Sequence, residues 1–201
     1  EDDSLTTAGV AALLDTDCIG RDLLVVPSLT STNTVLKERY LNHPHGFVLL
    51  AEEQTDGRGR LGRSFASPAG TGIYLTILLH PTLPIQHIQF VTIAAAVAVA
   101  EAIGQTAGFD PQIKWVNDVL MQGRKLCGIL TEAMIEAPTG APTESQTEAL
   151  TEALTEAPTE SQTESQTESP TESPTESHDF LIRFLFFKIA MANKQLSHPS
   201  Q

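Results

Sequence analysis

The feature that most limits what this chain can fold into is a low-complexity repeat in its second half. From Thr143 to Ser177 a four-residue unit, Thr-Glu-(Ala/Ser)-(Gln/Leu/Pro), recurs without interruption. A period of four drifts around a helix, and the unit carries almost no apolar surface, so it cannot offset the entropy lost on ordering its backbone. We therefore expect residues 134–177 to be disordered. The folded part is expected in residues 23–133, after a weakly helical lead-in of residues 1–22.

Most of the formal net charge of -13 belongs to that repeat. Residues 132–177 hold eleven Glu and no Lys or Arg, whereas residues 1–131 hold thirteen acidic and nine basic side chains. The acidity therefore says little about the folded part, and no broad basic face is supplied, so general DNA or RNA binding is disfavoured. Two cysteines without metal-type neighbours, and no signal peptide, favour a reducing, cytoplasmic compartment. The longest apolar run, Phe90–Ile103, is expected to be too short to span a bilayer.

A short apolar tail, residues 178–201, follows the repeat. Phenylalanine, leucine and isoleucine crowd together between Phe180 and Ile189, interrupted by Arg183 and Lys188. The tail is too short and too charged for a spanning helix. An amphipathic surface anchor is one interpretation, but we expect the tail to pack poorly and to promote aggregation.

The part before the repeat alternates short apolar runs with amphipathic ones. Strands are expected at Leu23–Val26, Phe47–Ala51, Gly72–His80, Gln112–Val116, Val119–Met121 and Lys125–Glu132. Pro27 is expected to end the first strand, and residues 122–124 to join the last two as a hairpin. One helix is expected after Ser31-Thr32-Asn33, and any of these three residues could cap it. A second helix is expected over Ile88–Gly104. This order predicts an α+β fold with a mixed or antiparallel sheet packed against helices.

One segment is suited to anion binding. Residues 54–63 read Gln-Thr-Asp-Gly-Arg-Gly-Arg-Leu-Gly-Arg, directly after an apolar strand. Glycine lets the backbone approach a ligand, and arginine presents a rigid fork of donors that matches carboxylate and phosphate oxygens. The pattern predicts a loop that closes on an anionic small molecule. Taken alone, it is equally typical of a nucleic-acid contact or a solvated surface loop.

Three groups of residues, taken together, resemble one family. Ser31-Thr32-Asn33 precedes a helix, residues 54–63 follow a strand, and Lys114-Trp115-Val116-Asn117-Asp118 is followed by residues 124–130, Arg-Lys-Leu-Cys-Gly-Ile-Leu. In this order and spacing they resemble the catalytic domain of biotin protein ligases (biotin–[acetyl-CoA-carboxylase] ligases). The resemblance covers about residues 9–133, and the Gly-Arg-Gly-Arg-x-Gly-Arg run is the family's signature. Lipoate ligases share the fold with a different arginine-glycine signature, and are the lesser candidate.

The resemblance implies a fold related to class II aminoacyl-tRNA synthetases and a two-step reaction. The biotin carboxylate attacks the α-phosphate of ATP, which gives biotinyl-5′-AMP and pyrophosphate. A lysine of a biotin carboxyl carrier protein then attacks the mixed anhydride. Positive charge must offset the repulsion between the two anionic substrates, and Mg²⁺ would accompany the nucleotide.

The resemblance also assigns individual residues. Those implied to bind biotin are Ser31, Thr32, Asn33, Gln54, Gly57, Arg58, Gly59, Arg60, Lys125 and Gly128. Those implied to bind ATP are Arg58, Arg60, Arg63, Lys114 and Asn117. Arg58 and Lys125 would be catalytic, because they would hold the carboxylate and then the adenylate; Asp118 would help to shape the site, and no metal ligand is implied. Taken alone, a lysine beside a turn is usually solvated, so the assignment depends on the joint appearance of these groups.

The sequence departs from the family pattern in several places. Phe65 stands where the family often has Trp, which retains an aromatic ring, and Val116 replaces a frequent proline. No DNA-binding winged helix is recognisable, so no DNA partner is expected. No membrane partner is expected either, and a homodimer is left open. Beyond residue 133 the repeat replaces the family's further strands. A C-terminally truncated, impaired or inactive remnant is therefore the alternative to an active ligase.

Overall fold

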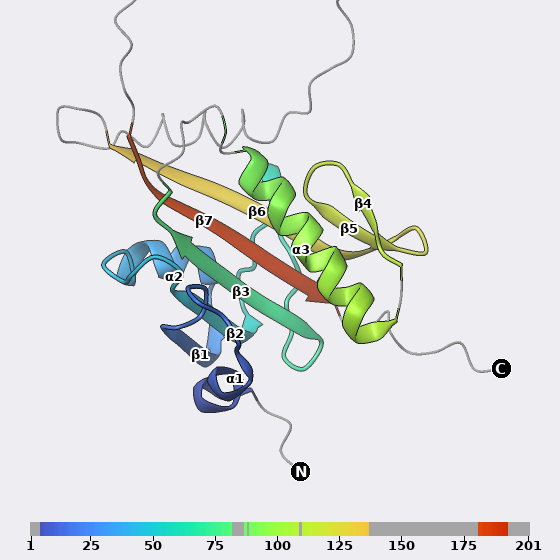
Figure 1. Ribbon diagram of the computed structural model, residues 1–201, viewed down its shortest axis with the longest axis horizontal. Coiled ribbons are helices and arrows are strands. Elements are labelled where there is room, and N and C mark those ends of the chain that lie inside the picture. Colours follow the sequence, from blue (N-terminus) through green and yellow to red (C-terminus); the bar gives the residue numbers. More distant parts are fainter. Residues whose placement is uncertain (1–4, 82–86, 88, 109, 137–180, 193–201) are drawn as a thin grey trace, which may run out of the picture.

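A computed structural model describes residues 5–81, 87, 89–108, 110–136 and 181–192 (Figure 1). The expected disorder of residues 137–177 falls outside these residues, whereas residues 134–136, which we also expected to be disordered, belong to the last strand before the repeat. The elements are α1 (Thr7–Leu13), β1 (Leu23–Leu29), α2 (Thr32–Arg39), β2 (Val48–Gln54), a 3₁₀ turn η1 (Arg60–Gly62), β3 (Gly72–Leu79), α3 (Gln89–Ala107), β4 (Gln112–Lys114), β5 (Asp118–Met121), β6 (Arg124–Glu136) and β7 (Leu181–Ala192).

The strands form one sheet in the order β1-β2-β3-β7-β6-β5-β4. β1 and β2 pair in parallel, and the other neighbours pair antiparallel. The β5–β6 hairpin turns at Gln122 and Gly123, whose φ angles of 50° and 75° suit a tight two-residue hairpin. The predicted α+β class, mixed sheet and closing hairpin are thereby confirmed.

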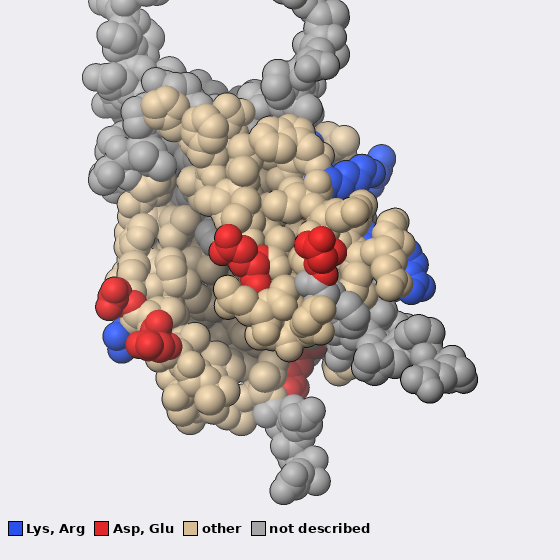
Figure 2. Space-filling model, turned by 45° about the vertical axis from the view of Figure 1, so that its right-hand side comes forward, with Lys and Arg blue, Asp and Glu red and all other residues tan. Residues whose placement is uncertain are grey.

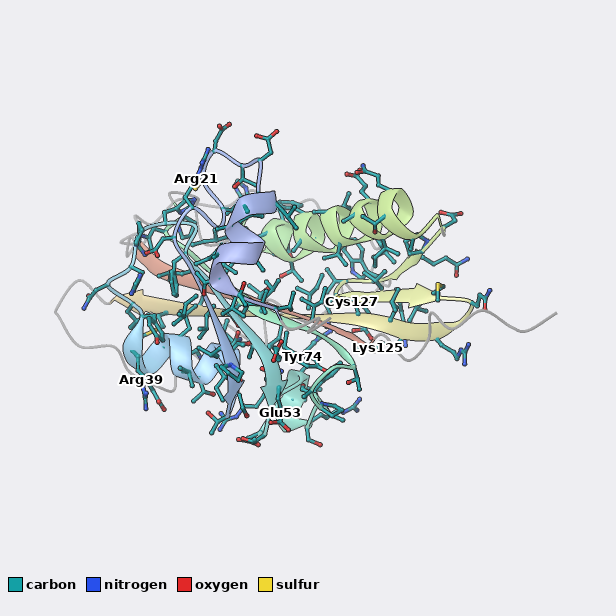
Figure 3. The ribbon with its side chains drawn as sticks, turned by 90° about the horizontal axis from the view of Figure 1, so that it is seen from below. Arg21, Arg39, Glu53, Tyr74, Lys125 and Cys127 are labelled. Atoms are coloured by element: carbon teal, nitrogen blue, oxygen red, sulfur yellow. The ribbon has the colours of Figure 1, made fainter. Side chains whose placement is uncertain are left out.

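The two longer helices cover opposite faces of the sheet (Figure 3). Side chains alternate between the faces of a strand with a period of two. Val48 and Ile77 accordingly join the core under α3, whereas Leu49 and Leu78, one position later, join the core under α2. Each face of the sheet therefore has its own hydrophobic core.

The apolar tail supplies the middle strand of the sheet, so our expectation that it packs poorly was wrong. β7 runs between β3 and β6 (Figure 1). Ile189, for example, is in register with Leu75 of β3 on one side and with Ile129 of β6 on the other. Central strands often appear in sequence as continuous apolar runs, without the alternation that marks a half-exposed strand. In the described sheet, β3 and β6 are joined only through β7.

β1 continues to Leu29, although we expected Pro27 to end it. β1 is an edge strand, and a proline is tolerated there because the missing N–H can face the unpaired side. Part of that edge is covered by α1, since the backbone N–H of Val25 donates to Oγ1 of Thr7 at 3.0 Å.

Helix α3 is longer than the expected apolar run and lies against the sheet. Its 19 residues are long and apolar enough to cross a membrane, so the expectation that this segment is too short was wrong on length. Its buried side chains are Thr92, Ala95, Ala96, Val99 and Ile103, which recur at helical spacing. Figure 2 shows one face of the molecule, on which most of the surface is uncharged and acidic side chains form a few separate groups.

Candidate active site

The glycine-arginine loop begins where β2 ends, at Gln54, and folds back on itself. The N–H of Phe65 donates to the carbonyl of Gly57, and the N–H of Gly59 donates to the carbonyl of Arg63, both at 2.6 Å. A Cβ added at Gly57 would lie 2.3 Å from the Phe65 oxygen, so only glycine fits there. The sequence therefore forms a tight backbone loop that holds its arginine side chains around a turn.

A cavity of about 320 Å³ lies between this loop and the β5–β6 hairpin. Its lining comprises Arg58, Gly59, Arg60, Leu61, Arg63, Ser64, Phe65, Asn117, Asp118, Lys125, Gly128, Ile129 and Leu130. Four of these side chains are basic and one is acidic. A cavity of this volume is within the usual range for small-molecule sites, and its charge favours an anionic ligand.

Arg60 ties the loop to the hairpin. Its Nη1 donates to Oδ1 of Asn117 at 2.9 Å, and Nδ2 of Asn117 donates to the carbonyl of Ile129 at 3.0 Å. The backbone carbonyl of Asn117 also accepts from the N–H of Ile129 at 2.8 Å. Asn117 is buried, so these bonds fix the loop against β6 and hold this wall of the cavity in place.

Lys125 is held inside the cavity by three neighbours. Its Nζ lies 2.6 Å from Oδ1 of Asp118 and 5.9 Å from the centre of the Phe65 ring. Its side chain also lies across Gly128, where an added Cβ would come within 2.9 Å of both Cε and Nζ. The resemblance implied that Gly128 leaves room beside Lys125, and the geometry agrees.

A buried polar cluster adjoins the loop on the α2 side of the sheet. Oε1 of Gln54 accepts from the backbone N–H and the hydroxyl of Thr32, at 3.0 and 3.1 Å. Nε2 of Gln54 donates to Oγ of Ser67 at 2.9 Å. Ser31 occupies the N-cap of α2 without a side-chain cap bond, and its fully buried hydroxyl has no hydrogen-bond partner among the described residues. Ser31 therefore carries an unsatisfied buried hydroxyl at the start of α2.

The same cluster contains residues that the sequence did not single out. Oγ1 of Thr76 lies 2.8 Å from Oγ1 of Thr32 and 2.5 Å from Oδ1 of Asn33. Nδ2 of Asn33 donates to the carboxylate of Glu132, which also accepts from Nζ of Lys37 at 2.5 Å. Asn33 and Glu132 are 99 positions apart, and no local pattern marks such a pair.

The structure brings most of the sequence-predicted residues together, in two adjoining groups. The cavity lining includes Arg58, Gly59, Arg60, Arg63, Asn117, Asp118, Lys125 and Gly128. The lining does not include Ser31, Thr32, Asn33, Gln54, Gly57 or Lys114. The first four of these form the buried polar cluster, Gly57 shapes the loop, and Lys114 is exposed on β4. Among the described residues, no group of three His, Cys, Asp or Glu could hold a metal ion.

Comparison with known proteins finds matches over this same part of the chain. The model of the Biotin/lipoate A/B protein ligase family matches residues 25–141. The bifunctional ligase/repressor BirA of Bacillus subtilis is 40% identical over 124 residues, which are 61% of this chain and 38% of that protein. The biotin–[acetyl-CoA-carboxylase] ligase of Mycobacterium tuberculosis is 39% identical over 118 residues, 56% of this chain and 44% of that protein.

The fold is also found among solved structures. The biotin protein ligase of Leishmania major in complex with biotin aligns with a TM-score of 0.55 and 18% identity, over 85% of this chain and 56% of that chain. This likeness concerns the fold. The present chain spans less than half the length of the two curated relatives.

Proposed function

This chain belongs to the Biotin/lipoate A/B protein ligase family, and from that premise we propose that it activates biotin with ATP and transfers it to a carrier-protein lysine. The observation that carries the proposal is the cavity in which the basic side chains of two distant segments, residues 58–63 and Lys125, meet. Biotin and ATP both present anionic groups to each other in the first step. A cavity with a surplus of fixed positive charge lowers the cost of bringing them together.

The chemistry of the first step divides among these residues. The biotin carboxylate forms a bond to the α-phosphorus of ATP, and the bond from that phosphorus to the bridging oxygen of pyrophosphate breaks. Arg58 and Lys125 hold the carboxylate and then the negatively charged adenylate, while Arg60 and Arg63 face the triphosphate. Most of the rate enhancement then comes from orientation and charge stabilisation rather than from proton transfer.

The polar cluster at the start of α2 provides the other end of the biotin site in this proposal. The free hydroxyl of Ser31 is a buried group that can bond to the ureido ring. A buried hydroxyl without a partner costs roughly 1–3 kcal/mol, so a ligand that satisfies it gains affinity. Gln54, which accepts a hydrogen bond from the neighbouring Thr32, completes the polar surface.

The second step requires the ε-amine of a carrier lysine to attack the adenylate carbonyl, with release of AMP. We propose a biotin carboxyl carrier protein as the acceptor, and the curated relatives named as biotin ligases support it. Mg²⁺ would enter with the triphosphate, since its preferred ligands are phosphate oxygens and water. A cytoplasmic location is part of the proposal, and Cys18 and Cys127 are not joined in a disulfide.

The test is to incubate the full chain with ATP, Mg²⁺ and biotin, and to look for biotinyl-5′-AMP by mass spectrometry. Formation of the adenylate supports the proposal, and a parallel reaction with lipoate distinguishes the lesser candidate. A folded chain that forms neither adenylate favours the inactive remnant. Circular dichroism of the same sample establishes that it is folded.

Arg58→Ala should abolish retention of the adenylate, because it removes the guanidinium expected on the carboxylate. Arg21→Ala is the matched control, since Arg21 is an exposed arginine outside the cavity lining (Figure 3). Equal retention of adenylate by the Arg58→Ala variant and the control would refute the role of Arg58.

A further inference from the structure

The first turn of α2 is held by side chains from three different strands. Gln54 of β2 accepts two hydrogen bonds from Thr32, as described above. Thr76 of β3 forms hydrogen bonds with both Thr32 and Asn33. Glu132 of β6 accepts a hydrogen bond from Asn33. One capping side chain is usually enough at the start of a helix. Here the start of α2 is fixed to the sheet by side chains from three strands.

Both ends of the Asn33 amide bond to protein side chains in this arrangement. Its Oδ1 faces the hydroxyl of Thr76 at 2.5 Å, and its Nδ2 donates to Glu132. Asn33 is 2% exposed and does not line the cavity. This differs from the role that the family resemblance implied, in which Asn33 faces the ureido ring.

We propose that Thr76 and Glu132 are positioning residues, which act through Asn33, and for Thr76 also through Thr32, to set the first turn of α2 and with it the buried hydroxyl of Ser31. Asn33 is then a structural link between helix and sheet rather than a ligand contact. The part of this inference that concerns biotin rests on the proposed function. The part that concerns the helix turn does not, and it can be measured without any ligand.

The charge of Glu132 contributes to the same arrangement. Its carboxylate lies between Asn33 and Lys37, whose Nζ is 2.5 Å away. Both charged side chains are partly buried, with 22% and 30% of their surface exposed. Lys37 is one turn along α2 from Asn33, so one carboxylate holds two successive turns of the helix against β6.

The opposite face of the sheet offers a matched control. Thr92 of α3 and Thr131 of β6 form a buried hydroxyl pair with an Oγ1–Oγ1 distance of 2.7 Å. This pair resembles Thr76–Thr32 in chemistry and burial, but it lies under α3 instead of α2. Thr92→Val therefore removes a buried hydroxyl at the same steric cost without touching the turn.

The first measurement is amide hydrogen exchange of the full, ligand-free chain. Thr76→Val should raise the exchange rate of the Thr32 amide about tenfold, because a hydrogen bond that orients the turn is lost. Thr92→Val should leave that rate unchanged. Glu132→Ala should also raise it, whereas Glu132→Gln, which keeps an acceptor oxygen for Asn33, should restore most of the protection. Equal exchange in the Thr76→Val and Thr92→Val chains would overturn the inference.

The second measurement is biotin affinity by calorimetry and the KM for biotin and for ATP in adenylate formation. Thr76→Val should raise the Kd and KM for biotin roughly tenfold and leave the KM for ATP and kcat near their original values. Asn33→Ala combined with Thr76→Val should cost less than the sum of the two single losses, since the two residues belong to one link. Additive losses would overturn the inference by showing independent contacts. If the unaltered chain binds no biotin, the proposed function fails, and the exchange experiment still decides the role of Thr76.

Discussion

Replacing the repeat by a short turn should make the protein more stable. β6 ends at Glu136 and β7 begins at Leu181, and these two residues are in register as neighbours in the sheet. The 44 residues between them, 137–180, therefore leave and return at one point of the sheet, as a long connection in a hairpin. Closing a loop costs an entropy that grows with the logarithm of its length.

The size of the effect follows from that relation. Shortening the connection from 44 residues to about four should stabilise the folded state by about 2 kcal/mol, from three to four halvings at about 0.6 kcal/mol each. For a chain of this size, the midpoint of thermal unfolding should rise by roughly 4–8 °C. A suitable replacement is a turn centred on Asn-Gly, which favours the hairpin geometry.

The assay is thermal and urea-induced unfolding of the full chain and of the shortened one, followed by circular dichroism. A variant with the repeat scrambled at constant length is the control, and it should unfold at the original midpoint, since length rather than order sets the closure entropy. A shortened chain that is less stable than the original would refute the reasoning, because the repeat would then contribute contacts of its own. Truncation after Glu136 should instead unfold the sheet, since β3 and β6 lose their common neighbour.

Three further predictions concern single residues. Gly57→Ala should cost about 1–3 kcal/mol of stability in urea titrations, since its Cβ would lie 2.3 Å from a backbone oxygen; Gly59→Ala, with its nearest contact at 3.4 Å, should be tolerated. Gly128→Ala should leave the unfolding midpoint nearly unchanged but lower the rate of adenylate formation by about tenfold or more, because only the flexible end of Lys125 must move from its position. Burial, and then a neighbouring imidazole, lower the pKa of His80 below 6.5. The folded state therefore binds this proton less well than the unfolded chain, and stability falls as the pH drops through 6.5. His80→Gln should flatten the fall in unfolding midpoint between about pH 7.5 and about pH 5, and an unchanged slope would contradict this.

Much of the fold before the repeat could be predicted because its signals are local. The apolar run that became β2, the alternation in β3 and the Gln122-Gly123 turn each lie within a few residues. β7 was missed because an apolar segment after a long polar repeat has no neighbour in sequence to pair with. Its partners, β3 and β6, are fixed only by tertiary structure.

The candidate site shows the same division. The glycine-arginine loop and the Lys125–Gly128 pair carry a recognisable motif, and the structure places them at one cavity. Thr76 lies inside the expected strand Gly72–His80 and Glu132 ends the expected strand Lys125–Glu132, but neither residue was singled out. Their role depends on α2 lying against both β3 and β6, which β7 separates in the sheet, and no spacing in the sequence encodes that arrangement.

The position of β7 also bears on how the protein is made. During translation, the strands up to β6 leave the ribosome as two groups that share no hydrogen-bonded edge, β1-β2-β3 and β4-β5-β6. The strand that unites them is synthesised only after the whole repeat has been added. Until then each group presents an unpaired strand that can bind other chains, so the length of the repeat sets how long the nascent protein remains exposed to misassembly.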